Sequence, residues 1–116
     1  MAKQKYVTHL TTRSQCPVAG TLDILGDKWT MVVVRDLILG KTKFGEFLES
    51  PEHITTNILT ERLKRLESMS LVERSLYQNN PARYEYHLTP MGRDLREVLL
   101  ALKTWGLKHL NPKRTV

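Results

Sequence analysis

"HITTNILTERLKRLESMSLVERSLYQNNPARYEYHLT", residues 53–89, begins with the hydrophobic period of a helix and ends with the alternation of a β-strand. A hydroxyl side chain at Thr55 can cap a helix that runs through Met69. The apolar side chains of this helix fall within one narrow sector, at Leu59, Leu63 and Leu66. The opposite face is polar, so the sequence predicts a helix that presents a polar surface outward.

Two strands follow this helix. Residues 83–88 alternate tyrosine or leucine with polar side chains, which is the period-two pattern of a half-buried strand. Residues 71–78 form a plausible partner strand. Asn79 to Ala82 connects them, with asparagine and proline as turn formers. The sequence therefore predicts a small antiparallel hairpin directly behind a polar-faced helix.

The preceding chain predicts three further helices. Proline at the first helical position opens one over residues 17–25. Asp27 can cap a second helix through Leu39, which a glycine closes. The apolar run 31–34 would also suit a buried strand, but length and the two caps favour the helix. A short helix is expected over residues 43–49.

The last predicted helix begins at Thr89-Pro90 and extends to Leu110. Its apolar residues are spaced four, three, four and three apart, and they are Met91, Leu95, Val98, Leu102 and Trp105. A chain of 116 residues buries only a modest core. We therefore expect this stripe to be buried against a second copy of the chain.

The composition of the chain limits the partners and the compartment that we expect for it. The 116 residues suit one domain, and 18 Lys and Arg against 12 Asp and Glu give a net charge of +6. Such a surplus attracts polyanions, first nucleic acid and then anionic lipid, although a basic surface can also serve solubility alone. No apolar run is long enough for a membrane span, so no membrane partner is expected. One cysteine and no secretion signal indicate the cytoplasm.

The order helix, short helix, polar-faced helix and hairpin predicts a winged helix-turn-helix that binds double-stranded DNA. The major groove admits one polar-faced helix, and a following hairpin can reach the minor groove with a cation. The candidate DNA contacts are Lys41, Lys43, Thr55, Thr56, Asn57, Thr60, Lys64, Asn79, Asn80 and Arg83. Two alternatives stay open: a polar face that is merely solvated, and a winged helix that binds protein. In the second case duplex affinity would be indifferent to Arg83→Ala and Lys64→Ala.

These residues also resemble a known family. "CPVAGTLDILGDKWTMVVVRDLILGKTKFGEFLES", "ITTNILTERLKRLE" and "ARYEYHLTPMGRDL" are similar to the HxlR-type winged helix-turn-helix regulators, relatives of the MarR group. The resemblance covers residues 16–105. It implies a homodimeric bacterial repressor or activator on a pseudo-palindromic operator, with dimer contacts from both ends of the chain. One departure is Ser70, where the family pattern leads us to expect glycine before the first wing strand.

The resulting fold class is mainly α with a small antiparallel β-hairpin, a winged helix-turn-helix with helical dimerisation elements at both ends. Its domain occupies residues 16–110, between a flexible arm over 1–15 and a tail over 111–116. The expected partners are double-stranded DNA, a second copy of the chain, and a small-molecule or electrophilic effector.

Cys16 has two interpretations. It precedes a helix and follows Arg13 by three residues, and both features favour the reactive thiolate. Cysteines at this position sense oxidants or electrophiles in several similar regulators, and a resolving thiol would have to come from the other subunit or a small molecule. Alternatively, Cys16 is a small packed residue. The sequence leaves both open.

No enzymatic site emerges. The histidines are scattered without metal-ligand spacing, and no nucleotide loop or nucleophile elbow is present. Trp29 and Trp105 could line a small-molecule pocket, but such positions favour a role in the core. We therefore expect no metal, no cofactor and no catalysis.

Overall fold

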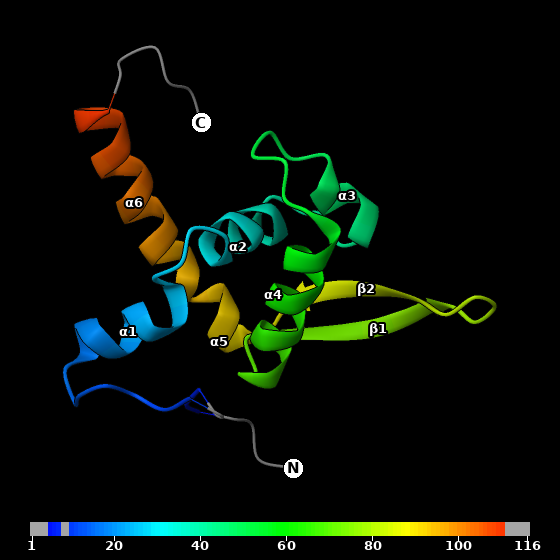
Figure 1. Cartoon of the computed structure of the whole chain (residues 1–116), viewed down its shortest axis with the longest axis horizontal. Helices are drawn as coiled ribbons and strands as arrows, with labels where there is room; N and C mark the ends of the chain where they lie inside the picture. Colours follow the sequence, from blue (N-terminus) through cyan, green and yellow to red (C-terminus); the bar gives the residue numbers. More distant parts are fainter. Residues whose placement is uncertain (1–4, 8–9, 111–116) are drawn as a thin grey trace.

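The computed structural model describes residues 5–7 and 10–110, so the predicted tail over 111–116 and part of the predicted arm lie outside the described residues. Figure 1 shows helices and one two-stranded antiparallel sheet, as the predicted fold class requires. The elements are α1 (Pro17–Leu25), α2 (Thr30–Ile38), α3 (Phe44–Leu48), α4 (Thr56–Ser68), β1 (Val72–Gln78), β2 (Arg83–Leu88), α5 (Pro90–Arg93) and α6 (Leu95–His109).

Two of the predicted helix starts, at Thr55 and Thr89, carry the expected side-chain cap. Thr55 Oγ1 accepts a hydrogen bond from the backbone N–H of Ile58 at 3.3 Å, at the start of α4. Asp27 was predicted to cap the second helix, and its Oδ2 accepts from the N–H groups of Trp29 and Thr30 at 3.0 Å each, but the N-cap of α2 is Trp29. Helix α2 begins at Thr30, because the three residues before it form a turn that the carboxylate closes.

The run 31–34 is helical, as its length and caps predicted. Val33 and Val34 are almost fully buried. They belong to a core formed by α2, α3, α4 and the end of the hairpin that carries Val72 and Leu88. The buried apolar members are Val33, Val34, Leu37, Phe47, Ile54, Leu59, Leu63, Leu66, Met69, Leu71, Val72 and Leu88. The predicted sector of α4 therefore forms the centre of the core.

Helix α4 ends in a left-handed turn at Ser70, whose φ is 61°. The N–H of Ser70 donates to the carbonyl of Glu67 and that of Leu71 donates to Leu66, both at 3.0 Å. This is the Schellman pattern, in which the left-handed position is usually glycine. The serine at this position therefore keeps the closure that a glycine would make, at some conformational cost.

The final helix differs from its prediction. The sequence predicted one helix from residue 90 to 110, and the structure breaks it at Asp94 into α5 and α6. Helix α5 is anchored to the chain before it, because Thr89 Oγ1 donates to the carbonyl of Ser70 at 2.7 Å and the Arg93 guanidinium donates to that of Leu88 at 3.1 Å. The single-helix prediction is wrong here, because the apolar spacing continues through Asp94 and gives no sign of the break.

The hairpin forms as predicted, with β1 and β2 antiparallel and a bulge between Leu76 and Gln78. A third segment, residues 42–43, is hydrogen-bonded to β2. The N–H of Tyr86 donates to the carbonyl of Thr42 at 2.8 Å, and the backbone of Lys43 forms an isolated antiparallel β-bridge with Glu85. The chain just before α3 thus holds the hairpin beside the helix-turn-helix.

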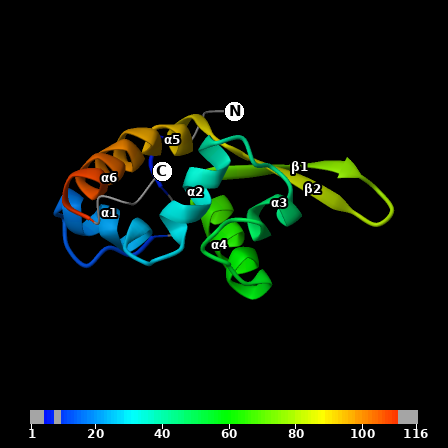
Figure 2. The ribbon, with the colours of Figure 1, turned by 90° about the horizontal axis from the view of Figure 1, so that it is seen from above.

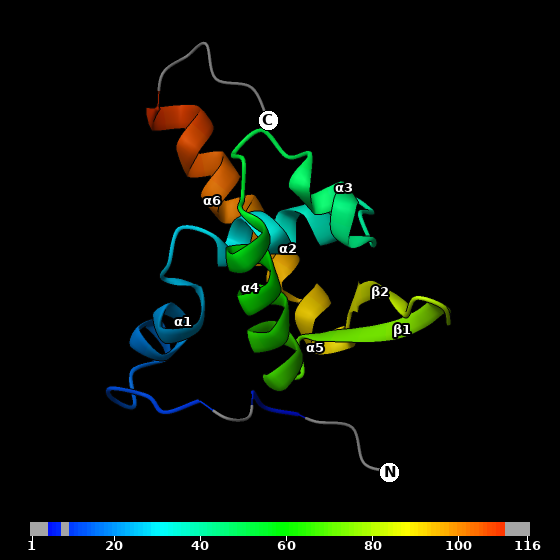
Figure 3. The ribbon, with the colours of Figure 1, turned by 45° about the vertical axis from the view of Figure 1, so that its right-hand side comes forward.

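The elements divide the molecule into two sides. Figure 1 shows α1 and α6 on one side and the hairpin extending from the other, with α4 between them. Seen from above, α4 projects from the face opposite α5 (Figure 2), and the rotated view keeps it in front, between α1 and the hairpin (Figure 3). The polar face of α4 is therefore free to meet a large partner.

Candidate nucleic-acid interface

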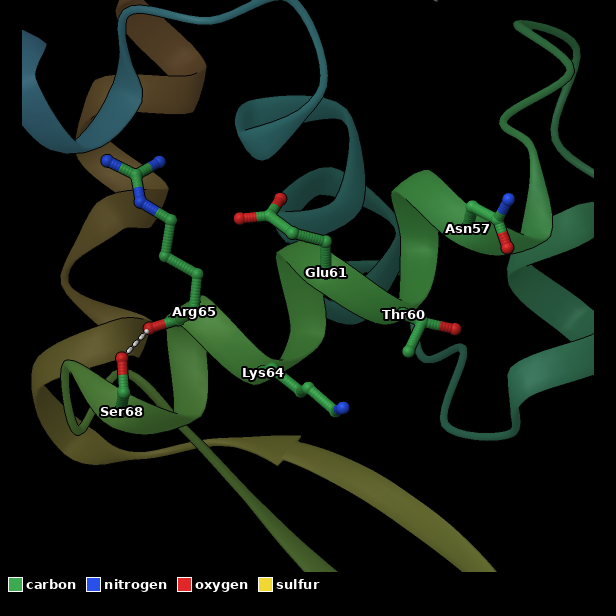
Figure 4. Close-up of a pocket in the computed structure, with 6 residues that line it drawn as sticks. All are labelled: Asn57, Thr60, Glu61, Lys64, Arg65 and Ser68. Atoms are coloured by element: carbon green, nitrogen blue, oxygen red, sulfur yellow. Dashed lines mark hydrogen bonds between the residues drawn. The ribbon is translucent and has the colours of Figure 1, made fainter.

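The polar face of α4 is the centre of the candidate interface. Asn57, Thr60 and Lys64 are exposed and lie along the open depression drawn in Figure 4, which Glu61 and Arg65 also line. The Thr60 hydroxyl donates to the carbonyl of Thr56 at 2.8 Å, which fixes its oxygen on the helix. Three of the sequence-predicted contacts therefore share one accessible surface.

The N-terminus of α4 adds backbone donors. Thr56 is exposed in the first turn, where N–H groups have no partner inside the helix. Such a terminus favours a phosphate oxygen. Thr55 is exposed as well, but its side-chain oxygen is engaged in the cap, so it shapes the terminus rather than offering a free acceptor.

A second group of cations lies between α3 and the part of the hairpin near its tip. Lys43 and Arg83 line one groove of about 220 Å³ between α3 and the strands, together with Tyr77 and Tyr84. The Lys43 ammonium lies 4.8 Å from the centre of the Tyr77 ring, a cation–π distance. The structure thus brings together two predicted contacts that are forty residues apart in sequence.

Lys41 has a different setting. Its ammonium donates to Ser50 Oγ at 2.9 Å, and that hydroxyl donates in turn to the buried carboxylate of Asp36. Arg35 binds the same carboxylate and pairs bidentately with Glu52 at 2.7 Å, which lowers the pKa of Glu52. This network joins α2 to the turn before α4, so Lys41 is half-buried and hydrogen-bonded within the protein, whereas Lys43 is exposed.

The tip of the hairpin carries Asn79 and Asn80, both exposed as their predicted role requires. The Gln78 side chain closes the turn by donating to the carbonyls of Asn80 and Pro81, at 3.4 and 3.2 Å. The amides at the tip therefore stand on a supported turn at the far end of the hairpin (Figure 1).

An ion pair joins the hairpin to α4. Arg74 Nε lies 3.3 Å from Glu67 Oε2, and its guanidinium carbon lies 4.2 Å from the centre of the Tyr84 ring. This contact fixes β1 relative to the helix. Nothing in the spacing of these residues predicted it, because the contact depends on how the strands twist past α4.

The side of α4 that carries Arg62 and Arg65 is bound to the end of α1. Arg62 Nε donates to Asp27 Oδ2 at 2.8 Å, and the Arg65 guanidinium donates to the carbonyls of Asp23 and Ile24 at 2.6 and 3.1 Å. Burial alone would raise the pKa of Asp27, but hydrogen bonds from Thr30, Arg62 and two backbone amides hold it well below its usual range. Nothing in the sequence indicated this connection, because Arg62 and Arg65 lie far along the chain from the residues they bind.

Cys16 stands at the start of α1 and is exposed. Its N–H donates to Ser14 Oγ at 3.2 Å. Arg13, expected to assist the thiol, instead directs its guanidinium to Asp23 at 2.5 Å and to the carbonyl of Ala19 at 3.4 Å. In this protomer the sulfur is therefore accessible, and the packed alternative would require a second subunit.

The predicted apolar stripe of the last helix divides within α6, between Val98 and Leu102. Met91 and Leu95 are half-buried against the core, and Val98 is also half-buried. Leu102 and Trp105 are 55% and 61% exposed. Only the outer part of the predicted dimer stripe is thus fully available to another molecule.

Comparison with known families settles the class of the protein. The model of the HxlR-like helix-turn-helix family matches residues 24–114. The chain belongs to this family. An HxlR relative in Bacillus subtilis, the uncharacterised HTH-type transcriptional regulator YdeP, is 43% identical over 94 residues, which cover 81% of this chain and 73% of YdeP.

Solved structures agree. The redox regulator HypR in its oxidised form is 39% identical, with a TM-score of 0.73 over 87% of this chain and 100% of HypR. The reduced form of the transcriptional regulator YodB from B. subtilis is 29% identical, with a TM-score of 0.69 over 87% of this chain and 100% of YodB. The HxlR protein described here is therefore a winged helix-turn-helix transcriptional regulator, in a family of DNA-binding proteins rather than enzymes. Among its described helices none has the length and apolarity to cross a membrane.

Proposed function

We propose that this HxlR protein acts as a homodimer that binds a pseudo-palindromic operator, with α4 in the major groove and the hairpin as a wing on the flanking DNA. The observation that carries the proposal is the division of the molecule into two sides. Exposed apolar side chains gather on α1 and α6, and exposed polar and cationic side chains gather on α4 and the hairpin.

The dimer surface is supported by helix α6. None of its fifteen residues is buried, although Leu100, Leu102, Trp105 and Leu107 are large and apolar. An isolated helix of this length is marginal in water, so most of its stability must come from packing. Helix α1 adds exposed Val18 and Leu22 on the same side. A second copy of the chain would bury both helices.

On DNA, a two-fold axis between the protomers would place the two α4 helices about 34 Å apart, one turn of the duplex. Asn57 and Thr60 would then approach base edges, where asparagine can make two bonds to adenine. Lys43, Lys64 and Arg83 would contact phosphates or the minor groove. Lys41 contributes chiefly by holding the turn before α4, through Ser50.

The test is selection of bound sequences from a random duplex library by the purified protein. The proposal predicts recovery of a motif with dyad symmetry. A pool without a common motif would contradict it. Recovery of a single unsymmetrical half-site would support DNA reading by α4 and contradict the homodimer.

We further propose that oxidants or electrophiles regulate this binding through Cys16. The thiol is exposed, and the similar structures include a redox regulator solved in oxidised and reduced forms. A hydroperoxide would transfer one oxygen to the sulfur, giving a sulfenic acid and releasing the alcohol; a second thiol, from the partner subunit or a small molecule, would then form a disulfide and release water.

The test compares the protein with Cys16→Ser before and after treatment with cumene hydroperoxide. Treatment should change the operator affinity of the protein by tenfold or more, which corresponds to about 1.4 kcal/mol. The serine variant should bind the operator equally with and without treatment. Equal responses of both proteins would exclude Cys16 as the sensor.

A further inference from the structure

We infer that Arg65 is a positioning residue: by capping the end of α1 it fixes the direction of α4, and so sets the separation of the two recognition helices in the dimer. This inference rests on the proposed homodimer. It gives a function to a cation that lies beside the DNA-facing surface but is committed to another helix.

The geometry at the end of α1 is that of a cap supplied by a distant residue. The last carbonyls of a helix have no partner inside it. In α1 the carbonyl of Leu22 accepts from Gly26, and those of Asp23 and Ile24 accept from the Arg65 guanidinium at 2.6 and 3.1 Å. Cationic side chains are favoured at this negative end of the helix dipole. Arg65 therefore binds α1 through two directed bonds.

Arg62 reinforces the contact from the same side of α4, because residues three apart share a face of a helix. It donates to Asp27, whose other oxygen lies 3.7 Å from the Arg65 guanidinium. Asp27 also holds the first turn of α2. One carboxylate thus joins α4 to the connection between α1 and α2.

Figure 4 shows how this arrangement divides the cations of α4. The Arg65 side chain rises toward the connection between α1 and α2, whereas Lys64 and Thr60 point away from it into open space. Arg65 is half-buried and Lys64 is exposed. Adjacent residues therefore have separate roles, one in docking the helix and the other in contacting DNA.

Helix α1 is also the element that carries exposed Val18 and Leu22 toward the proposed partner. It would contact the second subunit on one side while Arg65 holds α4 on the other. The position of α1 in the dimer would thus determine where each α4 points. Arg13 binds the carboxylate of Asp23, whose carbonyl holds Arg65, so the chain beside Cys16 joins the same connection.

The test measures the distance between nitroxide spin labels on the two recognition helices by pulsed dipolar spectroscopy. The labels are attached at Thr60→Cys in a Cys16→Ser background. We expect one narrow distribution centred at about 34 Å, the spacing of successive major grooves. Arg65→Met, which keeps the stem and the helix propensity, should shift this distribution or make it at least twice as wide.

Lys64→Met is the matched control. It removes one cation from the adjacent position of α4 without touching α1, so the distance distribution should stay as in the labelled parent, even though DNA affinity falls. Arg65→Lys keeps a donor to one carbonyl and should give an intermediate distribution. If Arg65→Met fails to fold by circular dichroism, Arg65→Lys and Arg62→Met carry the comparison.

The outcomes separate the two proposals. An unchanged narrow distribution in folded Arg65→Met would overturn the positioning role and leave the homodimer intact. Absence of any dipolar coupling in the labelled parent would show that no dimer forms, and would overturn both. Equal broadening in Arg65→Met and Lys64→Met would also overturn the inference, because loss of charge alone would explain it.

Discussion

At the scale of single residues, Asp27 connects several elements. It closes the turn before α2 and binds Arg62 of α4, and these bonds hold its pKa below the ordinary 3.8 against the opposing effect of burial. The unfolded carboxyl therefore binds a proton more readily than the folded one. Asp27 stabilises the fold fully above pH 3.8, and this contribution is lost as the pH falls below that value.

Asp27→Asn should lower the free energy of unfolding by about 1–3 kcal/mol at neutral pH, because it removes the charge from several hydrogen bonds. The difference from the parent should shrink as the pH falls below 3.8, because the unfolded parent then binds a proton that the folded carboxyl does not. Urea unfolding at neutral pH and near pH 3, at one fixed protein concentration, measures both quantities. A difference that does not change with pH would show that the charge of Asp27 is unimportant.

Ser70 is a second residue with a measurable effect. It adopts a φ of 61° at the end of α4, a conformation that costs an L-residue other than glycine roughly 1–2 kcal/mol. Ser70→Gly should therefore raise the free energy of unfolding by about 1 kcal/mol, reduced by the extra freedom of glycine in the unfolded chain. Thermal unfolding gives the result. A loss of stability would mean that the serine side chain makes a favourable contact that outweighs its backbone cost.

At the scale of elements, sequence patterns predicted what depends on neighbouring residues. The period of α4, the alternation of β2 and the cap at Thr55 are local, and the structure confirms each of them. The shared face of Asn57, Thr60 and Lys64 follows from the same period. These features needed no knowledge of the tertiary structure.

Features that depend on tertiary contacts could not be predicted in this way. The break at Asp94 leaves no mark in the apolar spacing, and the bond from Thr89 to the carbonyl of Ser70 that anchors α5 forms only after folding. The engagement of Lys41 with Ser50, and of Arg65 with α1, depends on side chains that meet only after folding. A basic residue in a sequence is a candidate for DNA contact, and only the fold shows whether its side chain is already bound to another group of the protein.

The wing offers the clearest test at this scale. Removing one cation from a DNA phosphate should reduce the slope of log affinity against log salt by about 0.9. Arg83→Ala should therefore lower both the affinity for the selected operator and this slope, measured by fluorescence anisotropy across a salt series. Arg83→Lys is the control and should keep the slope. An unchanged slope in Arg83→Ala would place the wing away from the DNA.

At the scale of the whole molecule, one asymmetry organises function. Large apolar side chains are exposed on α1 and α6, and polar and cationic side chains are exposed on α4 and the hairpin on the other side. Half-buried Arg62 and Arg65 connect the two sides. Dimerisation and DNA reading are therefore expected to depend on each other.

Trp105→Glu should weaken the dimer, because it places a charge on an apolar side chain that the second copy would bury. Sedimentation equilibrium should show monomers at concentrations where the parent is dimeric. Leu39→Glu is the matched control, since Leu39 is 69% exposed but lies at the end of α2, outside the α1–α6 surface. Dissociation by the control alone would place the interface elsewhere.

Hydroxyl-radical footprinting on the selected operator tests most directly whether two copies of α4 read one face of a duplex. The proposed dimer predicts two protected segments on that face, with centres about 10 base pairs apart, each flanked by protection of the minor groove beside the wing. A single protected segment, or protection spread evenly along the duplex, would contradict it.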